Sequence, residues 1–282
     1  MNYSESALTF NCADALLVGV LARPEQSVRR GVIVLVGGPQ YRVGSHRQFL
    51  QLARDLAAEG VPVLRFDYRG MGDSAGDVRT FEALDEDLRC AIDMFCKQVP
   101  ELKEVVIWGL CDAASAALMY AHRDPRVAGL VVANPWVRTE AGLAATYVKH
   151  YYAQRLADGK FWRKLLTGRV DVVQALGELC NQLWGAKGSK SNAEQGDATL
   201  HFVQRMALGV ARFRGPLLCI LSGKDFTAQE FRSVLKQSPV WNAAWSQADV
   251  TLYEIHDANH TFASRAWRDL VVRSTVEWLR SW

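Results

Sequence analysis

The stretch that decides the fold is IWGLCDAASAALMY, residues 107–120, in which an apolar run passes through a glycine into an alanine-rich segment. The run has the composition of a buried strand, and the alanine-rich segment has helical spacing. A strand that turns directly into a helix presents the residue at the turn, here Cys111, at the edge of a sheet. Because this turn is sharp, small residues are needed two positions before and after it, and Gly109 and Ala113 meet that need.

The alternation of strand and helix extends along the chain. Near-continuous apolar runs, as expected for strands buried on both faces, lie at 31–38, 61–68, 104–109, 127–134, 216–223 and 250–257. Helical spacing of apolar residues marks 45–59, 81–97, 111–122 and about 264–279. Residues 7–23 alternate loosely and fit an antiparallel hairpin at the sheet edge. These patterns predict an α/β fold, a mostly parallel central sheet flanked by helices.

One segment interrupts the alternation. From about residue 138 to 212 the chain has no strand signal, is helical in pattern and carries several aromatic residues. We therefore predict a core domain of residues 1–136 and 213–282, with 137–212 as a helical cap (lid) insertion. The insertion follows a strand at the carboxyl edge of the sheet, where ligands bind in such folds. Its Tyr147 and Trp162, together with Gln40 outside it, are candidate substrate-binding residues.

Composition excludes some classes of function. The chain has 282 residues and a net charge of +3, which is too small to indicate a nucleic-acid partner. We expect no signal peptide, and no apolar run approaches the ~20 residues that stable membrane insertion requires. The six cysteines form no CxxC pair, which favours reduced thiols and a cytoplasmic location. The sequence sets no oligomeric state.

Two candidate nucleophiles compete. GDSAG, residues 72–76, matches the G-x-S-x-G pattern, but no strand enters it directly and no helix follows it at once. Ser74 is therefore interpreted as a loop residue. Cys111 has the strand before it and the helix after it, and the positive end of the helix dipole favours its thiolate form. The alternative is that Cys111 is a small buried side chain without chemical function.

A cysteine nucleophile needs a base, and the base needs a carboxylate that orients it. In an open α/β sheet these residues follow later strands, in the order nucleophile, acid, histidine. Asp225 lies just past the strand at 216–223, and His260 lies in the loop after the last strand. His256 competes with His260 but is expected to end that strand. Asp257 and Asp249 are weaker alternatives for the acid.

The oxyanion of an acyl-transfer reaction needs two hydrogen-bond donors. The backbone N–H of Asp112, directly after the nucleophile, is one candidate. The loop VGGPQ, residues 36–40, follows the first parallel strand and supplies the other. Pro39 has no N–H, so Gly38 is the first candidate and Gln40 the second.

With these residues in place, the chain resembles the α/β-hydrolase superfamily over essentially its whole length. FDYRGMGDSAGD is similar to a loop of that superfamily that follows its fourth strand, and GKD and DANHTF are similar to its acid and histidine segments. The departures are Cys111 in place of serine, a change shared by dienelactone hydrolase-like members, and Val36 where many members have histidine. GLCDAASAAL, VGGPQYRVGSHRQF and ANPWVRT resemble the exosortase A system-associated hydrolase type 1 family, whose members accompany bacterial exopolysaccharide and protein-sorting gene clusters. The resemblance implies no metal and no organic cofactor.

The leading hypothesis is a hydrolase that cleaves a small-molecule acyl ester or thioester through Cys111, His260 and Asp225 and an acyl-enzyme intermediate. Acyl transfer with the same three residues is the first alternative, because a dry cap can exclude water and admit an alcohol. The second alternative is an idle scaffold that binds a ligand or partner, and it rests on cysteine standing in place of serine.

Overall fold

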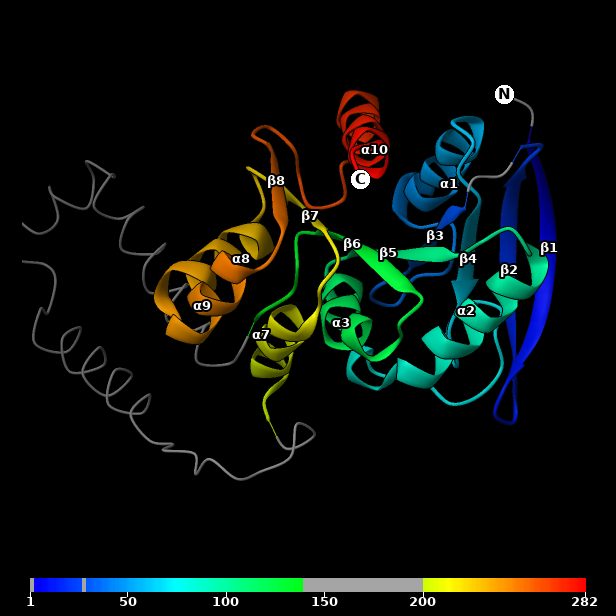
Figure 1. Cartoon of the computed structure of the whole chain (residues 1–282), viewed down its shortest axis with the longest axis horizontal. Coiled ribbons are helices and arrows are strands. Elements are labelled where there is room, and N and C mark those ends of the chain that lie inside the picture. Colours follow the sequence, from blue (N-terminus) through cyan, green and yellow to red (C-terminus); the bar gives the residue numbers. More distant parts are fainter. Residues whose placement is uncertain (1–2, 27–28, 139–199) are drawn as a thin grey trace, which may run out of the picture. The chain divides into compact units, whose positions relative to one another are not determined.

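The computed structural model describes residues 3–26, 29–138 and 200–282, and these residues contain an eight-stranded sheet in the order β1-β2-β4-β3-β5-β6-β7-β8 (Figure 1). β2 is antiparallel to both of its neighbours, and the six strands from β4 to β8 in this order are parallel. The predicted fold class is therefore confirmed. The strands are β1 (Tyr3–Cys12), β2 (Ala15–Pro24), β3 (Arg30–Leu35), β4 (Val63–Asp67), β5 (Glu104–Leu110), β6 (Val127–Ala133), β7 (Leu217–Ser222) and β8 (Val250–Ile255).

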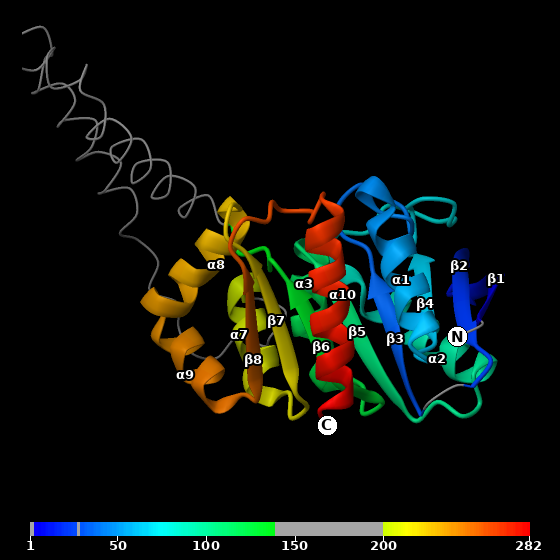
Figure 2. The ribbon, with the colours of Figure 1, turned by 90° about the horizontal axis from the view of Figure 1, so that it is seen from above.

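Helices cover both faces of this sheet. α1 and α10 lie side by side on one face, and α2, α3 and α7 lie on the other (Figures 1 and 2). α8 and α9 follow β7 in the chain, and α9 packs against α7. The helices are α1 (Gln48–Ala58), α2 (Asp85–Gln98), α3 (Asp112–Tyr120), α7 (Phe202–Arg212), α8 (Phe226–Gln237), α9 (Pro239–Gln247) and α10 (Arg265–Arg280), with short 3₁₀ turns at η1 (Ser45–Arg47), η2 (Phe81–Ala83) and η3 (Ala121–Arg123).

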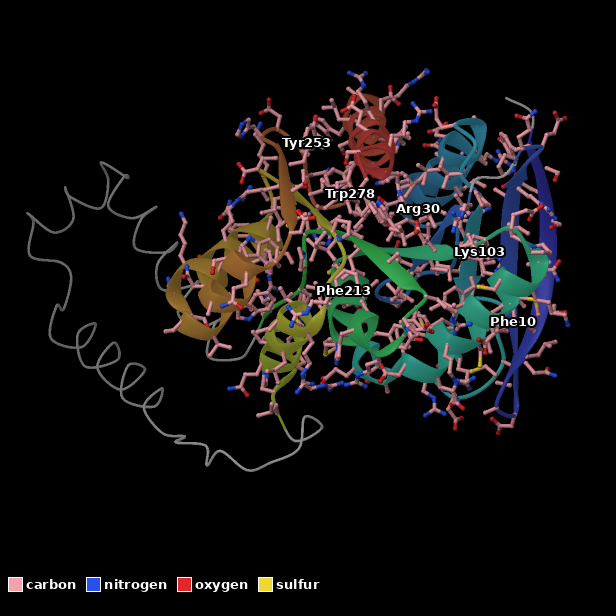
Figure 3. The ribbon with its side chains drawn as sticks, in the orientation of Figure 1. Phe10, Arg30, Lys103, Phe213, Tyr253 and Trp278 are labelled. Carbon is pink, nitrogen blue, oxygen red and sulfur yellow. The ribbon has the colours of Figure 1, made fainter. Side chains whose placement is uncertain are left out.

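The strands divide the core into two apolar layers, because successive side chains of a strand point to opposite faces. In β5, Val105 and Ile107 belong to the layer beneath α2 and α3, whereas Val106 and Trp108 belong to the layer beneath α1 and α10. Figure 3 shows one large side chain from each layer, Phe213 after α7 and Trp278 on α10. The central strands are buried on both faces, which explains their continuous apolar sequences.

α3 is the helix that positions the nucleophile candidate, and it is buried along almost its whole length. Its alanines let α7 approach closely, and an added methyl group at Gly209 of α7 would overlap the carbonyl oxygen of Leu118. α7 falls at the end of the range 137–212 that we expected to form the cap, and it packs with the core. The remainder of that range, 139–199, lies outside the described residues.

The described residues agree with one further expectation. The hairpin expected at 7–23 is the β1–β2 pair at one edge of the sheet. The five cysteines among these residues are free. In the described ranges, no helix combines the length and apolar character that crossing a membrane requires.

Candidate active site

Cys111 occupies the turn between β5 and α3 in a backbone conformation that is rare for residues other than glycine, with φ of 62° and ψ of −125°. Its N–H donates to the carbonyl of Ala133 at the end of β6 (3.0 Å), which ties the turn to the neighbouring strand. A methyl group added at Gly109 would lie 2.7 Å from the backbone of Ala113, so the turn needs glycine there. Strain of this kind persists where the surroundings enforce it, and it is typical of active sites.

Asp225 and His260 meet at the same edge of the sheet. The Nδ1 atom of His260 lies 2.9 Å from Oδ2 of Asp225, which is buried. Asp225 is also the N-cap of α8, where its carboxylate accepts hydrogen bonds from the N–H groups of Thr227 (3.3 Å) and Ala228 (3.1 Å). The helix N-terminus therefore holds the carboxylate in place, and the carboxylate holds the imidazole.

Cys111 and His260 line the same pocket, and interaction with the thiol is one cause of the shifted pKa of His260. Since Nδ1 faces Asp225, Nε2 is the ring nitrogen left for the thiol. Burial of the ring lowers its pKa, but hydrogen bonds and charges from Asp225 and Cys111 outweigh burial and raise the pKa of His260 to about 10. Asp225, His260 and Cys111 thus form a continuous chain of contacts in which the imidazole can take up and hold a proton.

The loop after β3 brings Gly38 next to the turn, as expected. Gly38 has φ of 64°, and its N–H donates to Oδ2 of Asp112 at 3.0 Å. The other carboxylate oxygen of Asp112, Oδ1, accepts from the N–H of Ala113 at 2.9 Å. The N–H of Gln40, the second candidate donor, is used in a bond to the carbonyl of Gly38 (2.8 Å). The side chain of Asp112 is the partner that sequence analysis did not anticipate.

The side chain of Gln40 holds this loop in place. Its Nε2 donates to the carbonyl of Gly37 (3.2 Å), and its Oε1 accepts from the N–H (2.9 Å) and the hydroxyl (3.0 Å) of Ser45. Gln40 lies on the wall of the pocket, and its amide is engaged by the protein itself.

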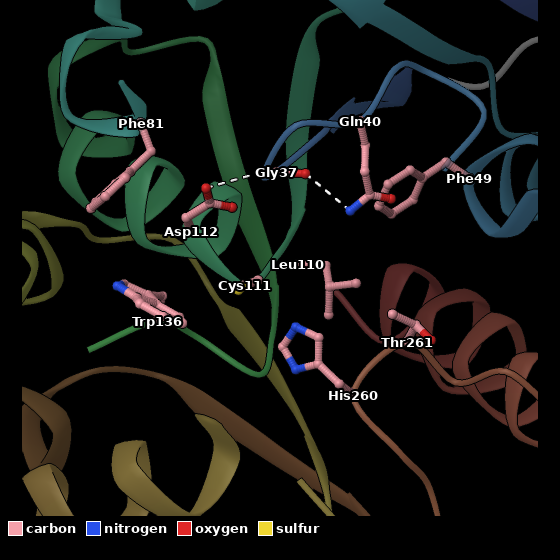
Figure 4. Close-up of a pocket in the computed structure, with 11 residues that line it drawn as sticks. Gly37, Gln40, Phe49, Phe81, Leu110, Cys111, Asp112, Trp136, His260 and Thr261 are labelled. Atoms are coloured by element: carbon pink, nitrogen blue, oxygen red, sulfur yellow. Dashed lines mark hydrogen bonds between the residues drawn. The ribbon is translucent and has the colours of Figure 1, made fainter. Parts of the chain in front are cut away.

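A pocket of about 320 Å³ opens over Cys111 and His260 (Figure 4). Its walls are mainly aromatic and aliphatic, with the Asp112 carboxylate facing the loop at Gly37. The lining residues are Gly37, Gly38, Gln40, Phe49, Phe81, Leu110, Cys111, Asp112, Trp136, His260 and Thr261. Such a pocket can hold an apolar acyl group beside the thiol. Tyr147 and Trp162, the other candidate substrate-binding residues, lie outside the described residues.

Ser74 and the competing histidine are placed away from this pocket's lining. The hydroxyl of Ser74 donates to the carbonyl of Asp67 (2.6 Å) and accepts from the N–H of Val18 (2.8 Å), so it joins the end of β4 to β2. His256 directly follows β8 and is exposed. These positions agree with the reading of Ser74 as a loop residue.

Asn134 and Ser222 are buried polar residues that sequence analysis did not single out. The amide nitrogen of Asn134 donates to the carbonyl of His260 (3.0 Å) and to the hydroxyl of Ser222 (2.9 Å), and its oxygen accepts from the Ser222 N–H (2.8 Å). The Ser222 hydroxyl donates to the carbonyl of Asn259 (2.9 Å). This network fixes the histidine loop against the ends of β6 and β7. A buried asparagine before proline at a strand end was the available signal.

Within the described ranges, no group of three or more His, Cys, Asp or Glu side chains is arranged to hold a metal ion. The polar atoms that converge on the pocket belong instead to the thiol, the imidazole, the Asp112 carboxylate and the Gly37–Gly38 loop.

The sheet order, the turn at Cys111 and the positions of the residues after β7 and β8 define an α/β-hydrolase. The chain belongs to the family described as Serine aminopeptidase, S33 (Hydrolase_4), whose model matches residues 27–263. The superfamily that the motifs predicted is thereby confirmed.

Solved structures agree on the fold. The esterase Pf2001 of Pyrococcus furiosus superimposes with a TM-score of 0.66 at 17% identity, covering 99% of this chain and 93% of that one. A dienelactone hydrolase from Anabaena variabilis gives a TM-score of 0.61 at 16% identity, covering 98% and 97%. Among curated proteins, the acyltransferase drtE of Aspergillus calidoustus is 25% identical over 141 residues, 49% of this chain and 45% of that protein. The chain spans less than half the length of the curated relatives it matches.

Proposed function

We propose that this chain is a hydrolase of small acyl esters or thioesters in which Cys111 is the nucleophile. The observation that carries the proposal is the contact chain from the Asp225 carboxylate through His260 to the thiol, at a strand-to-helix turn with positive φ. The family description names a serine, and this chain has cysteine at the corresponding turn. A thiolate attacks thioesters and activated esters readily, and it also leaves readily from the acyl-enzyme thioester.

In the proposed mechanism His260 takes the proton of the Cys111 thiol. The resulting thiolate attacks the acyl carbonyl, and the π electron pair of the carbonyl moves to oxygen. The tetrahedral intermediate collapses, and the imidazolium of His260 gives its proton to the departing alcohol or thiol. A water molecule then loses a proton to His260 and attacks the thioester of the acyl-enzyme. The acid leaves, and the thiol–imidazole pair is restored, while Asp225 keeps the ring oriented.

The oxyanion of both intermediates is assigned to the backbone N–H groups of Gly38 and Asp112. Gly38 follows β3 and Asp112 begins α3, so the two donors come from adjacent strands of the sheet. The part of residues 137–212 that precedes α7 is proposed to supply the lid, and Tyr147 and Trp162 of that segment, with Gln40, are proposed to contact the acyl group.

Acyl transfer is the second candidate, since one relative is described as an acyltransferase and the walls of the pocket are largely apolar. An alcohol that replaces water in the second step would take the acyl group by the same chemistry. We place either reaction in the cytoplasm and, on the motifs shared with exosortase A system-associated hydrolases, in the setting of exopolysaccharide gene clusters. A sugar hydroxyl would then be the acceptor to test.

The experiment is steady-state turnover of p-nitrophenyl acetate and of a short acyl thioester by the wild type, Cys111→Ala and Ser74→Ala. We expect Cys111→Ala to abolish turnover and Ser74→Ala to retain it, with a loss of stability of about 1 kcal/mol from its two hydrogen bonds. Product analysis with and without an added alcohol separates hydrolysis from transfer. Turnover that is unchanged in Cys111→Ala would falsify the assignment of the nucleophile.

A further inference from the structure

The carboxylate of Asp112 occupies the position where the proposed reaction needs hydrogen-bond donors to be free. Backbone N–H groups of Gly38 and Ala113 donate to it at 3.0 and 2.9 Å. Figure 4 shows the carboxylate directed at the Gly37–Gly38 loop beside Cys111. An anion held by convergent backbone N–H groups is the arrangement that an oxyanion hole provides for a tetrahedral intermediate.

The backbone is shaped to admit this side chain. A methyl group added at Gly37 would overlap Oδ1 of Asp112 and would lie 2.8 Å from the carbonyl of Leu110. Gly38 takes the left-handed conformation that turns its N–H toward Oδ2. Two glycines therefore make room for the carboxylate and offer it a donor.

We propose that Asp112 is the resting occupant of the oxyanion hole and that it controls access to the hole. A neutral acyl carbonyl reacts only after the carboxylate has turned out of the hole or has been protonated. This inference rests on the proposed function, because it concerns the donors of that same reaction. Two anions competing for the same N–H groups cannot both be satisfied, so the carboxylate inhibits the reaction while it stays in place.

Protonation is the physical route that the surroundings favour. Burial raises the pKa of Asp112, and its N–H donors and the charge of His260 oppose that rise without cancelling it. The groups that face Asp112 are Cys111 and His260 across the pocket and Tyr68 after β4, whose pKa is raised to about 12 by burial and by the charges of Asp112 and Asp87. Tyr68 therefore stays neutral. Of these groups, His260 is the one that can carry a positive charge opposite the Asp112 carboxylate.

The test compares wild type with Asp112→Ala and Asp112→Asn, using p-nitrophenyl acetate as substrate. We expect kcat/KM of Asp112→Ala to exceed that of the wild type by about 10²-fold, the worth of one freed oxyanion donor. The ratio of the two should be largest where Asp112 is ionised and should shrink as the pH falls through its raised pKa. Asp112→Asn, which keeps the shape but not the charge, should lie between them.

A probe that does not depend on turnover keeps the proposal separable from the proposed function. Acetaldehyde adds to the thiolate of Cys111 by forming an S–C bond, and the carbonyl oxygen takes a proton from His260, so the hemithioacetal uses the oxyanion hole. Its binding, measured as protection of Cys111 from iodoacetamide, should tighten about tenfold or more in Asp112→Ala. With iodoacetamide alone, the thiolate forms an S–C bond and iodide leaves, so no oxyanion hole is needed. This alkylation of Asp112→Ala should proceed at a rate within about twofold of wild type.

Asp14→Asn, in the exposed β1–β2 turn, is the matched control and should behave as wild type. A cooperative thermal unfolding transition serves as the check that each variant is folded. If aldehyde binding and turnover in Asp112→Ala equal those of the wild type or are weaker, the proposal that Asp112 limits access to the oxyanion hole is wrong. The assignment of Cys111 as nucleophile is unaffected by that result. Turnover that survives Cys111→Ala overturns the proposed function instead, whatever Asp112→Ala does.

Discussion

The carboxylate of Asp225 has two roles in this structure. As the N-cap of α8 it satisfies two backbone N–H groups, and with the same carboxylate it orients His260. Asparagine is about as good an N-cap as aspartate, whereas it cannot stabilise an imidazolium as a carboxylate does. The two roles can therefore be separated by one substitution.

Asp225→Asn should lower kcat by about 10⁴-fold, because the amide favours the wrong tautomer of His260. Since the cap is kept, its free energy of unfolding should stay within about 1 kcal/mol of wild type above pH 10, where the charge of His260 no longer contributes to stability. Stopped assays and denaturant titrations of the same preparations check both values. A large loss of stability with only a small loss of kcat would show that Asp225 acts as a cap alone.

Among single residues, the place of Cys111 at the strand-to-helix turn could be predicted and the direction of the Asp112 side chain could not. The choice of Cys111 over Ser74 depended on local pattern, because the small residues and the adjoining strand and helix are all close in sequence. The direction of the Asp112 carboxylate depends on a loop 74 residues away, which becomes its neighbour only when β3 and β5 pair. The sequence therefore predicted the backbone N–H groups of Gly38 and Asp112 as donors, but not that the Asp112 carboxylate accepts from the Gly38 N–H.

At the scale of elements, the ends of β6, β7 and β8 act together through Asn134. Asn134 is fully buried, with φ of 44°, and its side chain joins Ser222 to the backbone of His260. The network lies next to the histidine that the mechanism uses, so its integrity should affect the position of the imidazole.

Asn134→Ala should lower the free energy of unfolding by about 1–3 kcal/mol, because the buried N–H of Ser222 loses its acceptor. It should also lower kcat by about 10-fold to 10²-fold through displacement of His260. Asn134→Asp, which keeps the acceptor oxygen, should recover part of the stability. A pH–rate profile that is displaced in Asn134→Ala identifies a positioning role, and an unchanged profile with normal kcat argues against it.

Strand prediction succeeded where helix prediction was incomplete. Five of the six parallel strands are buried on both faces or nearly so, and this leaves a continuous apolar signature that pattern alone detects. The sixth, β8, lies at the edge of the sheet and is largely exposed. α8 and α9 were not predicted, although Asp225 caps the first and Ser238 followed by Pro239 opens the second. Those start signals are only one or two residues long, so they are weaker than a continuous apolar run.

At the scale of the whole molecule, the charge of His260 links the site to stability. The pKa of His260 is raised from its ordinary value of 6.5 to about 10, with burial opposing the rise and Asp225 and Cys111 producing it. A raised folded-state pKa contributes stability that is fully present below pH 6.5 and is lost as the pH rises through 10.

Thermal unfolding of wild type and His260→Gln between pH 6 and 10.5 tests this linkage. The wild type should have a higher melting temperature than His260→Gln. This difference should be largest at the acidic end of the range and should shrink toward pH 10. A difference in melting temperature that is constant across the range, or that grows with pH, would show that His260 is neutral in the folded protein.

The division of the chain into a core and an insertion is the prediction that depends most on the whole molecule. The described residues on both sides of 139–199 belong to one compact unit, and α7 is part of it. Sequence pattern could not separate α7 from the insertion, since both have a helical pattern of apolar residues and no strand signal lies between them in the sequence. What distinguishes α7 is its packing on α3, which is a property of the folded core.

The most direct test of the central claim is mass spectrometry of the intact protein, quenched with acid during turnover of p-nitrophenyl acetate. If Cys111 is the nucleophile, the wild type should gain one acetyl group, fragmentation should locate it on Cys111, and Cys111→Ala should gain none. An acetyl group on another residue, or turnover without any acylated protein, would contradict the claim.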